Sequence, residues 1–148
     1  MTNRQDIYPE PNRKEALGVN GVVATAHPLA TEAALHVLKD GGNAFDAAIC
    51  ALATLNVVEP YMSGMGGIGS ALVYSASEKR VRALNFSGKA PNKAEPAHFD
   101  PEIQNTGVKS ALVPGNVAGW FTLLETYGSM EAERLFEPAI NYAETGFP

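Results

Sequence analysis

One glycine-rich stretch of this sequence has residue types that could bind a ligand: Gly64-Met65-Gly66-Gly67-Ile68-Gly69. It fits the pattern G-x-G-x-x-G, in which backbone N–H groups at the start of a helix hold a pyrophosphate. That pattern works where the glycines follow a strand and open a helix, whereas here they follow an expected helix and open an expected strand. The glycine run therefore has three possible roles. It could bind a nucleotide, it could be a close-packed turn that needs glycine, or it could form the wall of a site completed by residues outside this chain.

The other reactive side chains form no complete catalytic or metal-binding set. His27 and His36 have no cysteine, histidine or carboxylate at a repeating ligand spacing, so we expect structural roles and no metal site. His98 stands in a polar loop and is expected to be solvated, and no serine lies in a G-x-S-x-G elbow. Cys50, among alanine, isoleucine and leucine, is expected to be a small buried hydrophobic residue rather than a nucleophile. We predict no catalytic residue and no cofactor within this segment.

Composition excludes several classes of protein. With 148 residues, 45% of them hydrophobic and 18% charged, the chain suits one folded domain or part of one. A net charge of -5 without a run of lysine or arginine gives no footprint for nucleic acid. The apolar run over residues 44–58 is interrupted by polar residues and is shorter than the ~20 residues that cross a bilayer, so no membrane span is expected. The first fifteen residues are polar and lack the apolar stretch of a signal peptide, which favours a cytoplasmic location.

The hydrophobic periodicity predicts a mixture of helices and short strands. The expected elements are a buried strand over 21–26, a helix over 29–38 closed by Gly41-Gly42, a helix over 44–58, a hairpin with strands 70–74 and 80–85, an irregular connection over 85–113, a helix opened by Pro114 and closed by Gly128, a short helix capped by Ser129, and a second one restarted by Pro138. The hairpin makes the sheet at least partly antiparallel.

The helix expected over 44–58 is the centre of the predicted fold. Asn43 is a good N-cap, and Asp46 lies in the first turn, where a carboxylate complements the helix dipole. Its circumference is almost uncharged, so it needs protein on most sides. We therefore expect the isolated chain to be poorly soluble or to self-associate.

Several motifs together resemble one family, the gamma-glutamyltransferases (gamma-glutamyltranspeptidases), members of the N-terminal-nucleophile (Ntn) hydrolases. The motifs recur in the family's order from about Gly18 to the last residue. They are Gly41-Gly42-Asn43-Ala44 with Asp46-Ala47-Ala48, Val58-Glu59-Pro60 with Ser63-Gly64 and Gly66-Gly67, Val113-Pro114-Gly115 with Val117-Ala118-Gly119, and Pro138-Ala139-Ile140 with Ala143 and Gly146-Phe147.

The resemblance implies an α+β fold, the αββα sandwich of Ntn hydrolases, of which this chain would be the N-terminal part of the large subunit. Residues 1–15 would form a polar arm and residues 16–148 the opening portion of the domain. The family's zymogen cleaves itself and exposes a threonine that attacks a gamma-glutamyl amide such as glutathione, passing the acyl group to water or an amine. That threonine would lie outside this chain, and the partners would be the remainder of the large subunit, the small subunit and the amide substrate. A noncatalytic relative acting as an interaction platform is a further alternative.

One position departs from the family pattern. After the second hairpin strand the family has Asp-x-Arg-Glu-x-Ala-Pro, whose arginine holds the alpha-carboxylate of the glutamyl group, and the matching residues here are Asn85-Phe86-Ser87-Gly88-Lys89-Ala90-Pro91. The hydroxyl of Ser87 cannot replace a bidentate, permanently charged guanidinium, although Lys89 could supply a positive charge from another direction. Ser87 and Lys89 are the candidate substrate-binding residues. We expect a related amidase or acyltransferase with altered or weakened recognition of the glutamyl carboxylate.

Overall fold

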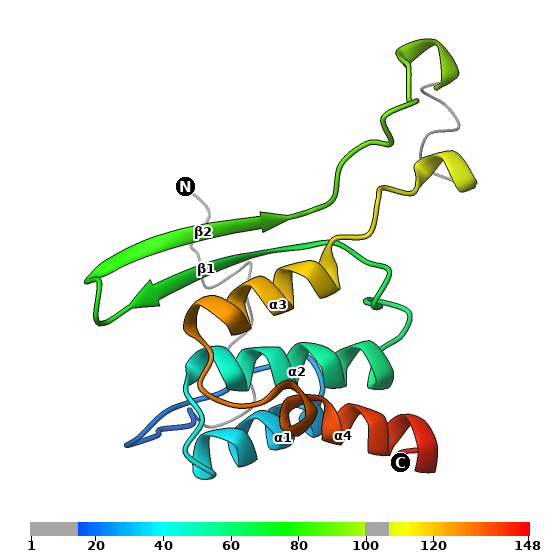
Figure 1. Cartoon of the computed structure of the whole chain (residues 1–148). Helices are drawn as coiled ribbons and strands as arrows, with labels where there is room; N and C mark the ends of the chain where they lie inside the picture. Colours follow the sequence, from blue (N-terminus) through cyan, green and yellow to red (C-terminus); the bar gives the residue numbers. More distant parts are fainter. Residues whose placement is uncertain (1–14, 100–106) are drawn as a thin grey trace, which may run out of the picture.

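The computed structural model describes residues 15–99 and 107–148. The described residues form α1 (Pro28–Lys39), α2 (Ala44–Val58), β1 (Gly69–Ser75), β2 (Arg80–Phe86), the short 3-10 turns η2 (Pro96–His98) and η3 (Val108–Ser110), α3 (Asn116–Tyr127) and α4 (Ala132–Thr145). In Figure 1 the hairpin lies over α3, α2 lies beneath α3, and α1 and α4 lie beneath α2. Apart from Glu15, the expected polar arm lies outside the described residues. None of the helices in the described ranges combines the length and apolar character that crossing a membrane requires.

Local capping signals fix the boundaries of α1 and α2. Gly41, with φ of 94°, follows the end of α1 in the left-handed region that glycine tolerates best. The Asn43 side-chain oxygen then accepts the N–H groups of Phe45 and Asp46 at 2.8 and 3.1 Å. A carboxylate oxygen of Asp46 accepts the Asn43 N–H in return at 2.8 Å, which completes a capping box. Both helices were therefore predictable from the residues at their ends.

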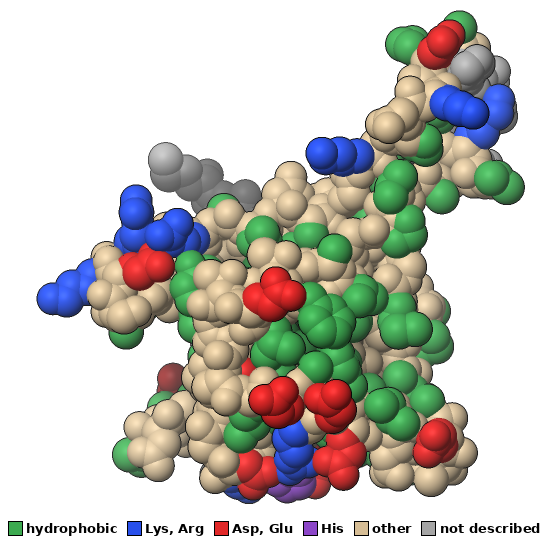
Figure 2. All heavy atoms as spheres, in the orientation of Figure 1, with side chains coloured by type: hydrophobic (Ala, Val, Ile, Leu, Met, Phe, Trp, Pro, Cys, Tyr) green, Lys and Arg blue, Asp and Glu red, His purple; other side chains and the backbone are tan. Residues whose placement is uncertain are grey.

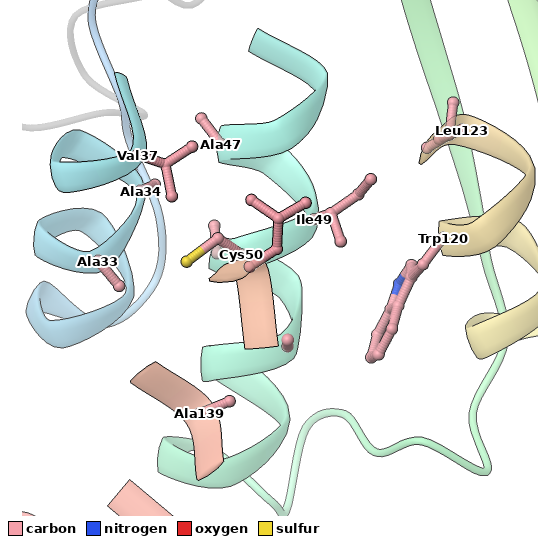
Figure 3. Close-up of a cluster of buried hydrophobic side chains, with 12 residues drawn as sticks. Ala33, Ala34, Val37, Ala47, Ile49, Cys50, Trp120, Leu123 and Ala139 are labelled. Carbon is pink, nitrogen blue, oxygen red and sulfur yellow. The ribbon is translucent and has the colours of Figure 1, made fainter. Parts of the chain in front are cut away.

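The hydrophobic core surrounds α2. Figure 3 shows three α1 residues facing Ala47 and Cys50 of α2, two α3 residues facing Ile49, and Ala139 of α4 lying beside the same helix. The residues from α1 are Ala33, Ala34 and Val37, and those from α3 are Trp120 and Leu123. Helices on three sides exclude water from most of α2, which confirms its predicted central position.

The hairpin has one face on the core and one face open. Ala71 and Val73 are half-buried and pack against the core cluster. The alternating residues Leu72 and Tyr74 are 80% and 60% exposed, and they pair across the hairpin with Ala83 and Val81. Because side chains alternate between the faces of a strand, the open face carries an apolar stripe without cover from the described residues.

The strand expected over residues 21–26 is absent. The described part of the chain offers these residues no backbone partner, Ala26 lies in a bend, and β1 pairs only with β2. Val23 and Thr25 are half-buried while Val22 and Ala24 are exposed. The segment has the alternation of a strand without the neighbour that would make it one.

Two predictions at the C-terminal end need correction. The helix closed by Gly128 is present as α3, but it begins at Asn116 rather than at Pro114, and the N–H groups of Gly115 and Asn116 at this start both bond to the Gly67 carbonyl. The two short helices expected around Pro138 form one helix, α4. Leu135 and Ala139, which flank the proline, are both buried against the core, and this packing offsets the lost hydrogen bond.

Candidate functional site

Three loops meet at the N-terminus of α3. They are the glycine-rich loop over residues 64–69, the stretch over 85–89 at the end of β2, and the turn over 113–116. The Gly67 carbonyl oxygen accepts the N–H groups of Gly115 and Asn116, each at 3.1 Å, so the first loop is bound directly to the third.

Asn116 is the side chain that fixes the glycine-rich loop. It is 4% exposed, and its amide nitrogen donates to the Gly64 carbonyl at 3.0 Å. The Gly67 N–H donates to the same carbonyl at 2.9 Å, and a Cβ added at Gly67 would lie 2.9 Å from that oxygen. At Gly67 the loop is thus close-packed, as one of the three interpretations predicted, whereas Cβ atoms added at Gly64 and Gly66 would meet no atom within 4 Å. The loop follows α2 and opens β1, which is the reverse of the order that a dinucleotide site needs.

Phe86 joins the end of β2 to α3. Cβ atoms added at Gly69 and Gly119 would lie 2.4 and 2.3 Å from atoms of the Phe86 ring, and one added at Gly115 would lie 2.3 Å from its carbonyl oxygen. Only residues without a side chain allow the strand and the helix to approach this closely. The end of β2 is thus held tightly on α3 immediately before the candidate residues.

Ser87 and Lys89 lie together where this strand ends. The backbone N–H of Ser87 donates to the side-chain oxygen of Asn85 at 3.0 Å, and the Ser87 hydroxyl donates to the same oxygen. The Lys89 carbonyl accepts the Val113 N–H at 3.1 Å, while the Lys89 side chain is exposed. Figure 2 shows basic side chains spaced along the arm that extends from this point, at the upper right, and the sequence of the arm makes all of them lysines. The structure brings the two candidates to the same edge of the three-loop junction.

A second cluster, which sequence reasoning did not identify, joins α2 to the turn between α3 and α4. One carboxylate oxygen of Asp46 accepts the N–H groups of Ser129 and Met130 at 2.9 and 3.3 Å, and the other accepts the Ser129 hydroxyl at 2.6 Å. The Asn43 amide donates to the Tyr127 carbonyl at 2.7 Å. The sequence marked Asn43 as an N-cap and Asp46 as a carboxylate in the first helical turn, but nothing near them indicated partners more than 80 positions away.

Asp46 is completely buried and ionised. Burial by itself raises the pKa of this carboxyl group, but the hydrogen bonds from the Ser129 hydroxyl and from three backbone N–H groups outweigh burial and lower the pKa. An acceptor surrounded by donors suits a structural anchor rather than a proton-transferring group. We assign it no role in chemistry.

The remaining reactive residues have structural surroundings. His27 caps α1, with its Nδ1 accepting the Leu29 N–H at 3.3 Å, and His36 is exposed in the last turn of the same helix. Cys50 is fully buried, and burial raises the pKa of its thiol to about 11. The side chain of His98 lies outside the described set. Within residues 15–99 and 107–148, no three potential ligands gather into a metal site.

Comparison with known proteins decides the family. A sequence profile described as gamma-glutamyltranspeptidase matches residues 30–148, which is most of the chain. The chain belongs to the gamma-glutamyltranspeptidase family. The resemblance seen in the motifs is thereby confirmed.

Relatives and solved structures agree with this assignment. The chain is 40% identical over 140 residues to a glutathione hydrolase proenzyme of Bacillus subtilis, covering 89% of this chain and 24% of that protein. It matches the crystal structure of Helicobacter pylori gamma-glutamyltranspeptidase with a TM-score of 0.84 and 37% identity, over 90% of this chain and 40% of that one. It also matches the crystal structure of a cephalosporin acylase from Bacillus halodurans with a TM-score of 0.84 and 38% identity. This match covers 100% of this chain and 28% of the acylase chain.

These matches confirm the α+β Ntn-hydrolase fold, of which this chain forms a part. The chain spans about a quarter of the length of its curated relative. The matched relatives are enzymes named for amide hydrolysis or transfer, so the comparisons favour neither a nucleotide-binding module nor a noncatalytic platform.

Proposed function

We propose that residues 16–148 are the opening portion of the large subunit of a self-processing enzyme that hydrolyses or transfers acyl groups from amides. The proenzyme name of a glutathione hydrolase relative and the likeness to an acylase support this proposal. The nucleophilic threonine belongs to a small subunit outside this chain. The remainder of the precursor is the partner, and the small-molecule substrate is a gamma-glutamyl or related amide. The cytoplasmic location stays a prediction.

Ser87 is the observation that carries the substrate proposal. It stands where the family's carboxylate-binding arginine belongs, and its hydroxyl is already hydrogen-bonded to Asn85. Lys89 is the nearest exposed cation along the chain. Overall sequence identity does not identify the acyl group of the substrate. A glutathione hydrolase and a cephalosporin acylase are almost equally similar to this chain, at 40% and 38% identity. We propose an amide acyl group whose carboxylate is recognised weakly, through Lys89 rather than through a guanidinium.

Self-processing is tested on the complete reading frame that contains this chain. The purified product is run on a denaturing gel, and the N-terminus of each band is sequenced. We expect two fragments, with threonine leading the smaller one. A single uncut chain after prolonged incubation would contradict the proposal.

The substrate proposal is tested with two anilides that differ only in the group at issue. Gamma-glutamyl anilide carries the alpha-carboxylate, and 4-aminobutyryl anilide keeps the amine but lacks the carboxylate. We expect kcat/KM values for the two within about tenfold, because no guanidinium binds the carboxylate. Ser87→Arg should raise the preference for the gamma-glutamyl compound roughly 10- to 100-fold, since a charge-assisted hydrogen bond contributes about 1.5–3 kcal/mol.

Two lysine variants test the role of Lys89. Lys89→Ala should raise KM for the gamma-glutamyl anilide and leave turnover of the 4-aminobutyryl anilide unchanged. Lys93→Ala removes another exposed cation from the same arm and is the matched control. A strong gamma-glutamyl preference in the unmodified enzyme that survives Lys89→Ala would overturn this mode of recognition.

A further inference from the structure

Two polar side chains share one side of the chain where β2 ends. Phe86, the last residue of β2, lies against α3, because a Cβ added at Gly119 would lie 2.3 Å from its ring. Asn85 and Ser87, on either side of Phe86, are two residues apart and therefore face the other way. The Ser87 hydroxyl is hydrogen-bonded to the Asn85 side chain, as this arrangement requires. Both side chains thus lie on the face turned away from α3, where the chain leaves the hairpin (Figure 1).

The backbone determines which way the amide of Asn85 faces. The Ser87 N–H donates to the amide oxygen of Asn85 at 3.0 Å. A rotated amide would turn its NH₂ group, which only donates, toward this N–H and would leave the N–H without an acceptor. The amide oxygen therefore faces Ser87.

The orientation of Asn85 in turn sets the polarity of the Ser87 hydroxyl. A hydroxyl group has one proton to donate and two lone pairs that accept. Ser87 donates its proton to the amide oxygen of Asn85, which has none to give. Among the described residues, no donor occupies the lone pairs of the Ser87 oxygen. Ser87 thus presents an acceptor, whereas an arginine at this position would present donors only.

Backbone contacts on both sides hold Ser87 in place. Before it, Phe86 is fixed against α3 by the close approach at Gly119. After it, Gly88 has φ of 82°, and a Cβ added there would lie 2.1 Å from the Val113 carbonyl oxygen. An acceptor that is already ordered loses little conformational entropy when it binds a ligand.

We propose that Ser87 accepts a hydrogen bond from the acyl group of the substrate, and that Asn85 is the positioning residue that makes Ser87 an acceptor. The inference rests on the proposed function, because it takes Ser87 to lie beside the alpha position of the acyl group. An ionised carboxylate has no proton to donate, so it gains no hydrogen bond from this hydroxyl. The preferred acyl group therefore carries an uncharged N–H or O–H donor, such as a primary carboxamide, where a gamma-glutamyl group carries its carboxylate.

A carboxamide also suits the charge beside Ser87. Lys89 is exposed two positions further along the chain, and its ammonium group only donates. A carboxamide offers its oxygen to Lys89 and its N–H to Ser87, whereas a carboxylate offers oxygens alone. Ser87 and Lys89 together therefore select a group that both donates and accepts.

Two uncharged substrates that differ in one donor test the inference. They are derivatives of gamma-glutamyl anilide in which the alpha-carboxylate is a carboxamide or a methyl ester, assayed with the complete, processed enzyme. We expect kcat/KM for the carboxamide to exceed that for the ester about 2- to 10-fold, the contribution of one neutral hydrogen bond. Both values come from one preparation, so the fraction of active enzyme cancels from their ratio. Equal values, or a preference for the ester, would overturn the inference.

Two variants of Asn85 test its positioning role. Asn85→Asp keeps an oxygen that accepts from the hydroxyl and the N–H of Ser87, so it should keep the preference for the carboxamide. Asn85→Ala frees the hydroxyl to rotate and donate, so the two kcat/KM values should become nearly equal. A preference that survives Asn85→Ala, or that Asn85→Asp abolishes, would contradict this role.

A pair of serine variants tests the acceptor itself. Ser87→Ala removes the lone pairs and should also make the two kcat/KM values nearly equal. Ser110→Ala is the matched control, because it removes another exposed hydroxyl that donates to a carbonyl, that of Gly107. The control should keep the ratio of the unmodified enzyme. An unchanged ratio in Ser87→Ala would contradict the inference.

Failure of this inference is distinguishable from failure of the proposed function. An enzyme that cleaves itself and turns over both derivatives with equal kcat/KM contradicts the inference alone. If no anilide is turned over, the proposed function fails, and calorimetric binding of glutamic acid 1-amide and glutamic acid 1-methyl ester to the same protein decides the inference. Tighter binding of the 1-amide supports it, and equal binding overturns it.

Discussion

Replacing Asp46 should destabilise this chain more than any other single loss of a charge among the described residues. The two carboxylate oxygens accept four hydrogen bonds, from the N–H groups of Asn43, Ser129 and Met130 and from the Ser129 hydroxyl. Asp46→Ala leaves these donors without an acceptor in a fully buried position. It also removes half of the capping box of α2.

The magnitude follows from these contacts. Loss of a capping interaction costs about 1 kcal/mol, and loss of a charge-assisted hydrogen bond costs about 1.5–3 kcal/mol. We therefore expect Asp46→Ala to lower the free energy of unfolding by about 3–4 kcal/mol. Asp46→Asn should also be harmful, because its NH₂ group would face at least one backbone N–H donor whichever way the amide turns: Asn43 on one side, or Ser129 and Met130 on the other. Asp40→Asn, which removes an exposed partner of Arg134, is the control and should have little effect.

The penalty should depend on pH in a defined direction. The folded-state pKa of Asp46 lies below its unfolded value of about 3.9. The stabilisation is therefore fully present above the unfolded value and is lost as the pH falls through the folded pKa. The difference between the wild-type chain and Asp46→Ala should be constant from about pH 5 to 8 and should shrink below about pH 4.

Urea unfolding of the 148-residue chain measures these differences at protein concentrations low enough that the expected self-association does not contribute, which equal midpoints at two concentrations verify. Trp120 is the only tryptophan and is 2% exposed, so its fluorescence reports loss of the core. With an m-value of about 2 kcal/mol per molar, a loss of 3–4 kcal/mol lowers the midpoint by roughly 1.5–2 M. Equal midpoints for Asp46→Ala and Asp40→Asn, or a wild-type midpoint for Asp46→Asn, would refute the reasoning.

Three further outcomes test other parts of the structure. Gly88→Ala should lower the melting temperature at least twice as much as Gly107→Ala. Both glycines have φ near 80°, a backbone conformation that costs alanine about 1 kcal/mol. Only at Gly88 would the new Cβ also meet an atom, the Val113 carbonyl oxygen at 2.1 Å. At pH 8 the Cys50 thiol should react with a disulfide reagent only as fast as the chain unfolds, because the thiol is buried and burial raises its pKa to about 11. Rapid labelling of Cys50 in the native chain would contradict this. Arg134→Ala should leave the urea midpoint almost unchanged at any salt concentration, because its two ion pairs are exposed; a large salt-dependent shift would show that they stabilise the fold.

The parts of the fold that sequence predicted are those determined within a few residues. The caps Asn43 and Gly41, the turn of the hairpin and the alternation in β1 all act locally, so the boundaries of α1, α2 and the hairpin could be placed within about one or two residues. The three errors have a different origin. Residues 21–26 lack a partner strand, the start of α3 is set by the Gly67 carbonyl, and α4 continues through Pro138 because residues on both sides pack on the core. Each depends on contacts distant in sequence.

The same distinction applies to the site. Sequence placed Ser87 and Lys89 immediately after the second hairpin strand, and the structure has them there. It did not reveal Asn116, whose amide bonds to a carbonyl 52 positions away, or the pairing of Asp46 with Ser129 across 83 positions. An asparagine after a glycine and an aspartate in a first helical turn carry no signal for such partners. Distant hydrogen bonds of this kind become visible only in the folded chain.

Several residues in and beside the family motifs of this chain therefore join its helices and loops to one another and take no part in chemistry. Asn43 and Asp46 join α2 to the α3–α4 turn, while Gly67, Gly115 and Asn116 bind the glycine-rich loop to the start of α3. The candidate substrate residues lie on the short stretch that these contacts hold in place, and that stretch is where this sequence departs from the family pattern. These hydrogen bonds and glycine contacts do not involve the side chains of Ser87 and Lys89, so the proposed difference in substrate recognition requires no change in the architecture around them.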